Sequence, residues 1–347
     1  MKTRYVLWLA AALLVAPIAF AQPNLTAPRA SQHAFVMQTA GLTEISVDYH
    51  RPGVNNRPIW GALVPYDAVW RGGANENTIF QVSSDITVNG EALPAGRYGL
   101  HMIPITGSWT IIFSKMADAW GSFSYDETED ALRVTASPRP RSHEERLSYR
   151  FEQPTNTSTE MVMAWEELEV PLSIEVNTTD VVLANMLVEL RGLPRFSWNG
   201  WNQIAAFALQ NNVRLDDALG WVDQSMQTAT NGANTLTKMG VLNALGRTIE
   251  ADAMEDQFYA IANENEMNTY GYQLLFGGRQ QESIPVFRKN VADYPESWNV
   301  HDSLGEALAA IGETSESIEH FEHARGMAPQ AQHARIDGVL TQLRASN

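Results

Sequence analysis

RPGVNNRPIWGALVPYDAVWRGGANE, residues 51–76, is the stretch around which the first half of this chain is arranged. It contains three arginines, two tryptophans, three prolines and four glycines, and it follows neither the helical nor the strand period. Segments of this kind form ordered loops that hold side chains in fixed, non-repeating positions. We therefore expect residues 51–76 to be a structured loop framed by strands.

On both sides of this loop the hydrophobic period is two residues, which is typical of strands. Ile45, Val47 and Tyr49 alternate with polar neighbours, and Asn89-Gly90 is a strong hairpin signal. Further runs that predict strands are 80–82, 86–88, 98–102, 109–113, 132–134, 147–151, 161–165 and 170–176. Residues 138–141, PRPR, indicate a loop or the edge of a sheet. Residues 35–178 are thus predicted to form an antiparallel β-sandwich or jelly-roll-like domain.

The period changes to that of a helix after Thr178-Thr179-Asp180. Small and apolar positions then recur 34 residues apart: 271, 278, 284, 287 and 295 recur as 305, 312, 318, 321 and 329, and Asn212 recurs as Gly246. A repeat of 34 residues is the period of paired tetratricopeptide helices. Residues 179–345 are therefore predicted to form about four stacked helix pairs, so the fold class is two-domain, all-β followed by all-α.

Residues 1–21 have the pattern of a signal peptide, with Lys2 and Arg4 before an apolar run and the sequence Ala19-Phe20-Ala21 at its end. We expect cleavage before Gln22, a flexible mature N-terminus over 22–34, and export to the periplasm or outside the cell. The apolar run is shorter than the roughly 20 residues of a spanning helix, and no later stretch is long enough to predict a transmembrane segment.

Composition excludes several classes of function. The chain has no cysteine, which rules out disulfides, thiol catalysis and thiolate metal sites. A net charge of −16 argues against nucleic acid as a partner. Motifs for nucleotide cofactors or a nucleophilic serine are absent, and no cofactor is predicted.

Three ordered blocks carry a resemblance to a known family. They are VDYHRPGVNNRPIWGALVPYDAVWRGGANENTIF from Val47, LPAGRYGLHMIP from Leu93 and WTIIFSKMADAWGSFSYDETEDALRV from Trp109. Together, over about residues 35–178, they resemble the secreted bacterial family known as domain of unknown function family 2911. The resemblance implies an exported β-rich domain, often followed by a tetratricopeptide-like helical tail, and it implies no activity, ligand or catalytic residue.

The arginines of the loop are the first candidates for a ligand site. Arg51, Arg57 and Arg71, with Asn75 and Glu76 beside them, could hold a carboxylate, a phosphate or a sugar acid. The alternative is structural: the guanidinium groups satisfy loop carbonyls and pair with the carboxylates of Asp48, Asp67 and Glu76. Ten of the eleven cations in residues 22–178 are arginine, which favours fixed hydrogen-bond geometry.

Aromatic and basic residues near the loop complete the candidate set. Trp60 and Trp120 could stack on a sugar ring, although filling the core is the more usual role of a tryptophan. His50 lies on the face of its strand opposite Tyr49, and Lys115 is the single lysine of the β region. The histidines have no metal-binding spacing, so no metal site is predicted. His320 and His323 are interpreted as exposed helix surface.

Two functions from different classes follow. The first is a non-enzymatic, exported binding or scaffold protein of the cell envelope, whose β domain recognises a small or glycan-like ligand and whose repeats dock a protein. The alternative is a periplasmic hydrolase of an anionic or glycan substrate. In that hydrolase His50, Asp48 or Glu76 would act as acid or base, and Arg51, Arg57 and Arg71 would clamp the anion.

Overall fold

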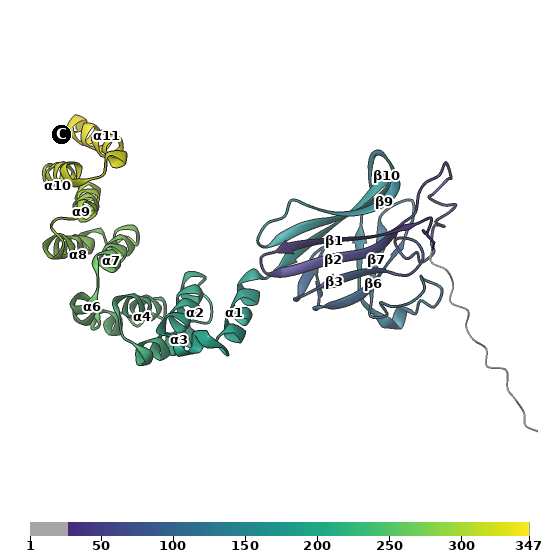
Figure 1. The fold of residues 1–347 in the computed structure, drawn as a ribbon, viewed down its shortest axis with the longest axis horizontal. Coiled ribbons are helices and arrows are strands. Elements are labelled where there is room, and N and C mark those ends of the chain that lie inside the picture. The colour runs from purple at the N-terminus through teal and green to yellow at the C-terminus, as the bar shows by residue number, and fades with distance from the viewer. Residues whose placement is uncertain (1–26, 347) are drawn as a thin grey trace, which may run out of the picture. The chain divides into compact units, whose positions relative to one another are not determined.

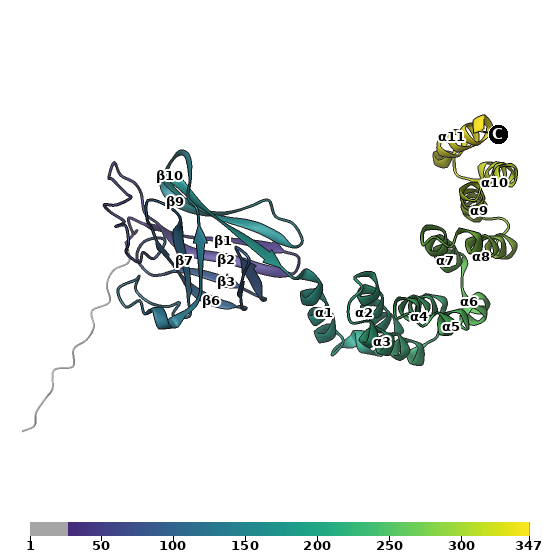
Figure 2. The same ribbon diagram turned by 180° about the vertical axis from the view of Figure 1, so that it is seen from behind.

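The structure, a computed structural model, describes residues 27–346 and divides them into two compact units, which separate between Val176 and Asn177. The predicted signal peptide, residues 1–21, lies outside the described residues. Figures 1 and 2 show strands in the first unit and helices in the second, which confirms the predicted all-β plus all-α fold class. Within the described residues no helix combines the length and apolar character needed to cross a bilayer.

The β unit consists of two antiparallel sheets (Figure 1). The six-stranded sheet has the order β1 (Gln32–Ala40), β2 (Thr43–Arg51), β3 (Thr78–Val82), β6 (Gly96–Ile103), β7 (Trp109–Ser114), β8 (Asp130–Ala136). The four-stranded sheet has the order β5 (Glu91–Leu93), β4 (Ile86–Val88), β10 (Ser158–Val176), β9 (Arg139–Glu152). A short 3₁₀ turn, Glu127–Glu129, precedes β8.

The sequence alternation places the core as predicted. On β2 the side chains of Ile45, Val47 and Tyr49 are buried, whereas Asp48 and His50 lie on the opposite, outer face. The β4–β5 hairpin turns at Asn89 and Gly90, whose φ angles are 48° and 86°. These left-handed angles suit asparagine and glycine, which explains why the dipeptide marked the turn.

One strand is longer than predicted. Residues 161–165 and 170–176 were expected as separate strands, but both belong to the continuous strand β10. Its first part pairs with β9 and its last part with β4. A β-bulge at Glu166, where φ is 58°, shifts the register within the pairing with β9 and interrupts the sequence pattern. Strand β9, which begins within the PRPR segment, is the edge of its sheet as predicted.

The helical unit is built from successive antiparallel pairs. After α1 (Thr178–Glu189) and the 3₁₀ turn Leu193–Phe196, the pairs are α2/α3 (Trp198–Gln210, Leu215–Thr228), α4 with α5 and α6 (Gly232–Ala244, Thr248–Asp252, Glu255–Ile261), α7/α8 (Glu264–Phe276, Gln280–Asp293) and α9/α10 (Trp298–Ala310, Thr314–Met327), followed by α11 (Gln330–Ser346). These are the four pairs that the 34-residue period predicted.

The repeated glycines have two structural roles. A Cβ atom built on Gly271 would lie 2.6 Å from the ring of Phe287, and one on Gly305 would lie 3.0 Å from the ring of Phe321. Each glycine therefore allows a phenylalanine of the second helix to pack against the first helix of its pair. The turns within pairs contain a left-handed residue, with φ as follows: Asn212 52°, Gly246 75°, Gly278 84° and Gly312 84°.

The interpretation of His320 and His323 as exposed surface holds for His323 and is wrong for His320, whose side chain is only 18% exposed. His301 of α9 is buried, with 8% of its surface exposed, and its ring centroid lies 5.3 Å from the centroids of both His320 and His323. The Nδ1 atoms of His301 and His320 are 3.0 Å apart. The spacing within α10 was read correctly, but the third ring comes from the other helix of the pair.

Candidate functional site

The loop of residues 52–77 is attached to both sheets. Gly53 bridges to Arg146 on β9, and Trp70 bridges to Met102 on β6. Gly72 is fixed as well, since its carbonyl accepts hydrogen bonds from Tyr149 (2.8 Å) and Thr78 (3.2 Å). Left-handed backbone positions within the loop are occupied by residue types that tolerate them: Asn55, Asn56, Gly61, Asp67, Gly72 and Asn75. The loop is therefore an ordered platform, as its composition predicted.

Each loop arginine donates hydrogen bonds to backbone carbonyls. Arg51 Nε donates to Leu147 O at 2.8 Å. Arg57 donates from Nε to Val54 O at 3.1 Å and from Nη2 to Gly53 O at 2.6 Å. Arg71 Nη1 donates to Asn75 O. These bonds agree with the structural interpretation of the three guanidinium groups.

The expected carboxylate partners of these arginines are engaged elsewhere. Glu76 accepts two hydrogen bonds from Arg29, at 2.8 and 2.7 Å, and Asp48 lies 2.7 Å from His33. Among the ion pairs of the described residues none involves Arg51, Arg57 or Arg71. The expected pairing with Asp48, Asp67 and Glu76 is therefore wrong, because residues that precede the loop in sequence occupy two of these carboxylates.

Arg57, Arg71 and Asn75 line one pocket, hereafter the arginine pocket, with a volume of about 310 Å³. Its lining residues are Ser31, Pro52, Arg57, Leu63, Val64, Trp70, Arg71, Gly73, Ala74, Asn75 and Trp165. The two guanidinium groups are thus the charged groups of the lining, which includes neither a carboxylate nor a histidine. Such a lining favours a negatively charged ligand and lacks a group for proton transfer.

Two tryptophans, Trp70 and Trp165, are among the apolar residues that line this pocket. The rings of Trp70 and Trp165 stack at 6.0 Å with an angle of 20° between them. Trp60 packs edge-on against both and against Trp109, which is core. Trp60 donates to Glu166 at the β10 bulge (3.2 Å), whereas the buried indole N–H of Trp165 has no partner within the described residues. Trp165 was not among the candidates, because it lies far along the chain on β10.

The loop after β7 supports Arg71. A Cβ atom on Gly121 would overlap Arg71 Cζ, so only a glycine admits the guanidinium group here. The same group lies over the ring of Phe123, 5.2 Å from its centroid. Burial lowers the pKa of Arg71 below its usual value, since the cation is partly removed from water without a paired carboxylate among the described residues.

His50 and Glu76 belong to a separate cluster on the outer face of β2. His50 Nδ1 lies 3.5 Å from Glu76 Oε2, and the ring of His50 lies 5.5 Å from that of His33. Burial lowers the pKa of His50, and the hydrogen bond from Arg29 lowers the pKa of Glu76. The residues predicted to act as acid or base are therefore held with Arg29 and His33 and do not line the arginine pocket.

Lys115 and Trp120 are both exposed, Trp120 to 59%, and neither lines the arginine pocket. His101, in contrast, is buried on β6, with its Nδ1 2.9 Å from Ser122 Oγ. Burial lowers its pKa to about 4, so the ring is neutral at physiological pH. Within the residues that the structure describes, no group of histidines and carboxylates has the geometry of a metal site.

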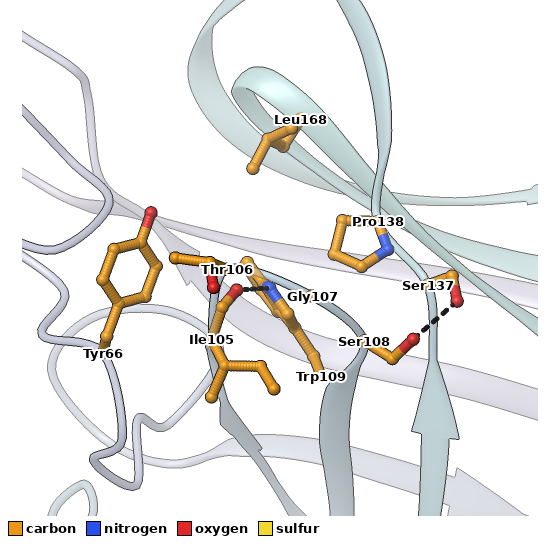
Figure 3. Close-up of a pocket in the computed structure, with 9 residues that line it drawn as sticks. All are labelled: Tyr66, Ile105, Thr106, Gly107, Ser108, Trp109, Ser137, Pro138 and Leu168. Carbon is orange, nitrogen blue, oxygen red and sulfur yellow. Dashed lines mark hydrogen bonds between the residues drawn. The ribbon is translucent and has the colours of Figure 1, made fainter.

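A second pocket of about 380 Å³ lies at the end of β7 and is uncharged (Figure 3). Tyr66 and Pro138 lie on opposite sides of the group of lining residues in Figure 3, and Ser108 and Ser137 hydrogen-bond to each other at 2.9 Å. Ser108 and Ser137 bond to each other and Trp109 donates to Ile105 O, and the lining has no charged side chain that could hold an ionic ligand. The arginine pocket is the stronger candidate site.

Comparison with known proteins supports the predicted family. Residues 31–174 match the family described as protein of unknown function (DUF2911), which confirms the resemblance. No curated protein matches the chain. The family description assigns no activity.

Solved structures that match are helical repeat proteins with low identity. MamA from Desulfovibrio magneticus is 16% identical, with 43% of this chain and 96% of that chain covered and a TM-score of 0.29. YrrB, described as a TPR protein with an unusual peptide-binding site, is 16% identical, with 46% and 84% covered and a TM-score of 0.29. The C-terminal part of a TPR protein from Cytophaga hutchinsonii is 14% identical, with 46% and 64% covered and a TM-score of 0.33. Helix pairing and the glycine–phenylalanine contacts therefore carry the assignment of the repeats. Such stacked helix pairs are the architecture of a protein-interaction scaffold.

Proposed function

We propose that this protein is an exported binding protein of the cell envelope, in which the arginine pocket of the β unit holds a small ligand and the helical repeats dock a protein partner. The observation that carries the proposal is the lining of the pocket. Arg57 and Arg71 face one cavity, fixed by backbone carbonyls and without carboxylate partners among the described residues. A guanidinium group oriented in this way is prepared to receive an external acceptor.

Binding is favoured over hydrolysis for a geometric reason. A general acid or base must lie within hydrogen-bond reach of the bond that it helps to break. The pocket lining contains no carboxylate or histidine, and Asp48, His50 and Glu76 are engaged with Arg29 and His33 or with each other. The hydrolase alternative would require these residues to leave their partners.

The ligand half of the proposal is tested on the full mature chain with a thermal-shift panel of neutral glycan fragments, organic acids and amines. The same compounds, with chromogenic esters and glycosides, are incubated to measure turnover. We expect saturable stabilisation by at least one compound, its loss in Arg57→Ala, and no turnover. Hydrolysis that disappears in Glu76→Gln or His50→Gln would replace binding by catalysis.

The docking half predicts a partner that the repeats alone recognise. Phe276, on the last turn of α7, is 81% exposed and stacks on Tyr272, so Phe276→Ser removes apolar contact surface without opening the core. Ile249, on α5, is 85% exposed and offers a second position. Crosslinking in intact cells should yield a partner protein. The amount of crosslinked partner should fall with each of these two substitutions and stay unchanged in Arg57→Ala. A partner lost only with Arg57→Ala would assign docking to the β unit.

Export is tested separately by cell fractionation and by mass spectrometry of the purified N-terminus. The proposal expects the chain in the envelope fraction or the medium, with Gln22 as its first residue. A cytoplasmic chain that retains residues 1–21 would overturn it.

A further inference from the structure

The lining of the arginine pocket combines two kinds of side chain. It includes the guanidinium groups of Arg57 and Arg71, and it includes the stacked Trp70 and Trp165 with Leu63 and Val64. Because no acidic side chain lines the cavity, the positive charge is not balanced within it. The charge also contrasts with the chain as a whole, whose net charge is −16.

The two guanidinium groups retain donors beyond those used on the backbone. A guanidinium carries five N–H groups. Arg57 donates from Nε and Nη2, and Arg71 donates from Nη1, so each keeps at least one nitrogen without a partner among the described residues. The backbone bonds fix each group, and the packing of Arg71 against Gly121 and Phe123 restricts it further. An arriving oxyanion would meet donors whose side-chain entropy is already reduced.

The apolar lining residues favour a ligand that has an apolar body in addition to an anionic group. A pocket of about 310 Å³ is at the lower end of the range for small-molecule sites. Aromatic rings favour a flat apolar body; of the two tryptophans Trp70 is half-buried, whereas Trp165 is only 1% exposed and supports the pocket from within the core. A free metal cation is disfavoured by the two arginines, and a neutral sugar would leave their charges uncompensated.

We infer that the arginine pocket binds a small organic oxyanion, with its carboxylate or phosphate group on Arg57 and Arg71 and a flat apolar body against Trp70 and Trp165. This inference rests on the proposed binding function and names the chemical class of its ligand. Arg57 and Arg71 determine the charge specificity, and the two tryptophans determine the shape specificity.

The test uses the full mature chain and four probes in isothermal titration: benzoate, phenyl phosphate, inorganic phosphate and benzyl alcohol. The first two carry both an anion and a flat body, the third carries the anion alone, and the fourth carries the body alone. We expect benzoate or phenyl phosphate to bind with a Kd of about 1 mM or tighter. Both single-feature probes should bind at least tenfold more weakly.

Variants then connect the binding to the two arginines. Arg57→Gln, at an exposed position, and Arg71→Lys, which keeps the charge but loses the planar fork, should each weaken binding about tenfold or more. Arg97→Gln is the matched control, because Arg97 is paired with the exposed Asp118 and does not line the pocket. Its affinity should stay within about twofold of the unmodified chain.

The outcomes separate the ligand class from the proposed function. Benzyl alcohol binding as tightly as benzoate, or Arg57→Gln binding as tightly as Arg97→Gln, overturns the oxyanion assignment. If the anions fail while a neutral glycan fragment binds and is lost in Arg57→Ala, the ligand class is wrong and the binding function stands. If neither the probes nor the wider thermal-shift panel binds, both are overturned.

Discussion

Substitution of Gly271 by alanine should destabilise the α7/α8 pair. The new Cβ atom would lie 2.6 Å from two ring atoms of Phe287 and 2.9 Å from a third. Contacts this short require the ring to move, and Phe287 is fully buried, with 0% of its surface exposed. Overpacking of a filled core costs about 1–3 kcal/mol. The helical preference of alanine over glycine offsets about 1 kcal/mol of this, which leaves about 0–2 kcal/mol. Because the ring of Phe287 is fully buried and has little room to move, we expect a net loss toward the upper end of that range.

Two other glycines calibrate this prediction. At Gly305 the corresponding contacts with Phe321 are 3.0, 3.0 and 3.2 Å, so Gly305→Ala should be milder than Gly271→Ala. Gly220, inside α3, has nothing within 4 Å of a new Cβ, so Gly220→Ala should stabilise its helix by about 0.5–1 kcal/mol. The three substitutions are chemically identical and differ in what the added methyl group meets.

Hydrogen exchange measured by mass spectrometry on the intact chain suits this comparison, because repeat proteins open locally and one midpoint does not describe them. Peptides from α7 and α8 report the opening free energy of that pair. The expected order of stability is Gly220→Ala, unmodified chain, Gly305→Ala, Gly271→Ala, each read in its own helices. Equal protection of α7 and α8 in the Gly271→Ala variant and the unmodified chain would refute the reasoning.

Three further outcomes are expected. Acidification should destabilise the α9/α10 pair, because burial and then a neighbouring histidine lower the pKa values of His301 and His320; the charged groups that face them are Arg288, Glu296, Glu316 and His323. The stability of the pair is therefore full above about pH 6.5 and falls as the pH drops toward the folded-state pKa values. The difference in hydrogen-exchange protection of these helices between pH 7.5 and pH 5.5 should become smaller in His320→Gln, and an unchanged difference would contradict the prediction. Tyr149→Phe removes the bond to Gly72 O and should lower the stability of the β unit by about 1 kcal/mol, whereas Tyr66→Phe, at a partly exposed ring, should not, as measured by thermal unfolding. Gly121→Ala should displace the guanidinium group of Arg71 and weaken any ligand that needs it, a result that titration of this variant against Arg97→Gln checks.

Local patterns predicted most of the fold because their physical causes are local. The alternation on β2 follows from the two-residue period of a strand, and the Asn89-Gly90 turn follows from left-handed backbone angles. The 34-residue spacing arises because a contact within one helix pair, that of Gly271 with Phe287, recurs in the next pair as that of Gly305 with Phe321. Where the sequence pattern was interrupted by the bulge at Glu166, the prediction divided one strand into two.

The candidate site was predicted only in part because its contacts span the chain. The loop was identified from composition, and Arg57, Arg71 and Asn75 do line one pocket. Their aromatic partner Trp165 lies on β10, which no sequence spacing connects to the loop. The partners of Asp48 and Glu76, residues His33 and Arg29, come from the N-terminal segment and could not be distinguished from the loop arginines by charge.

The structural and ligand-binding interpretations of the loop arginines are compatible, because one guanidinium group can bond to a backbone carbonyl and also bind a ligand. A guanidinium held by a backbone carbonyl loses mobility, and that loss makes its remaining N–H groups better anchors for an oxyanion. Arg51 is the useful contrast: its Nε also donates to a carbonyl, that of Leu147, but it does not line the arginine pocket. Removal of Arg51 should therefore affect stability without ligand affinity, whereas removal of Arg57 should affect affinity more than stability. A loop that only needed to be held together would show no such difference between the two.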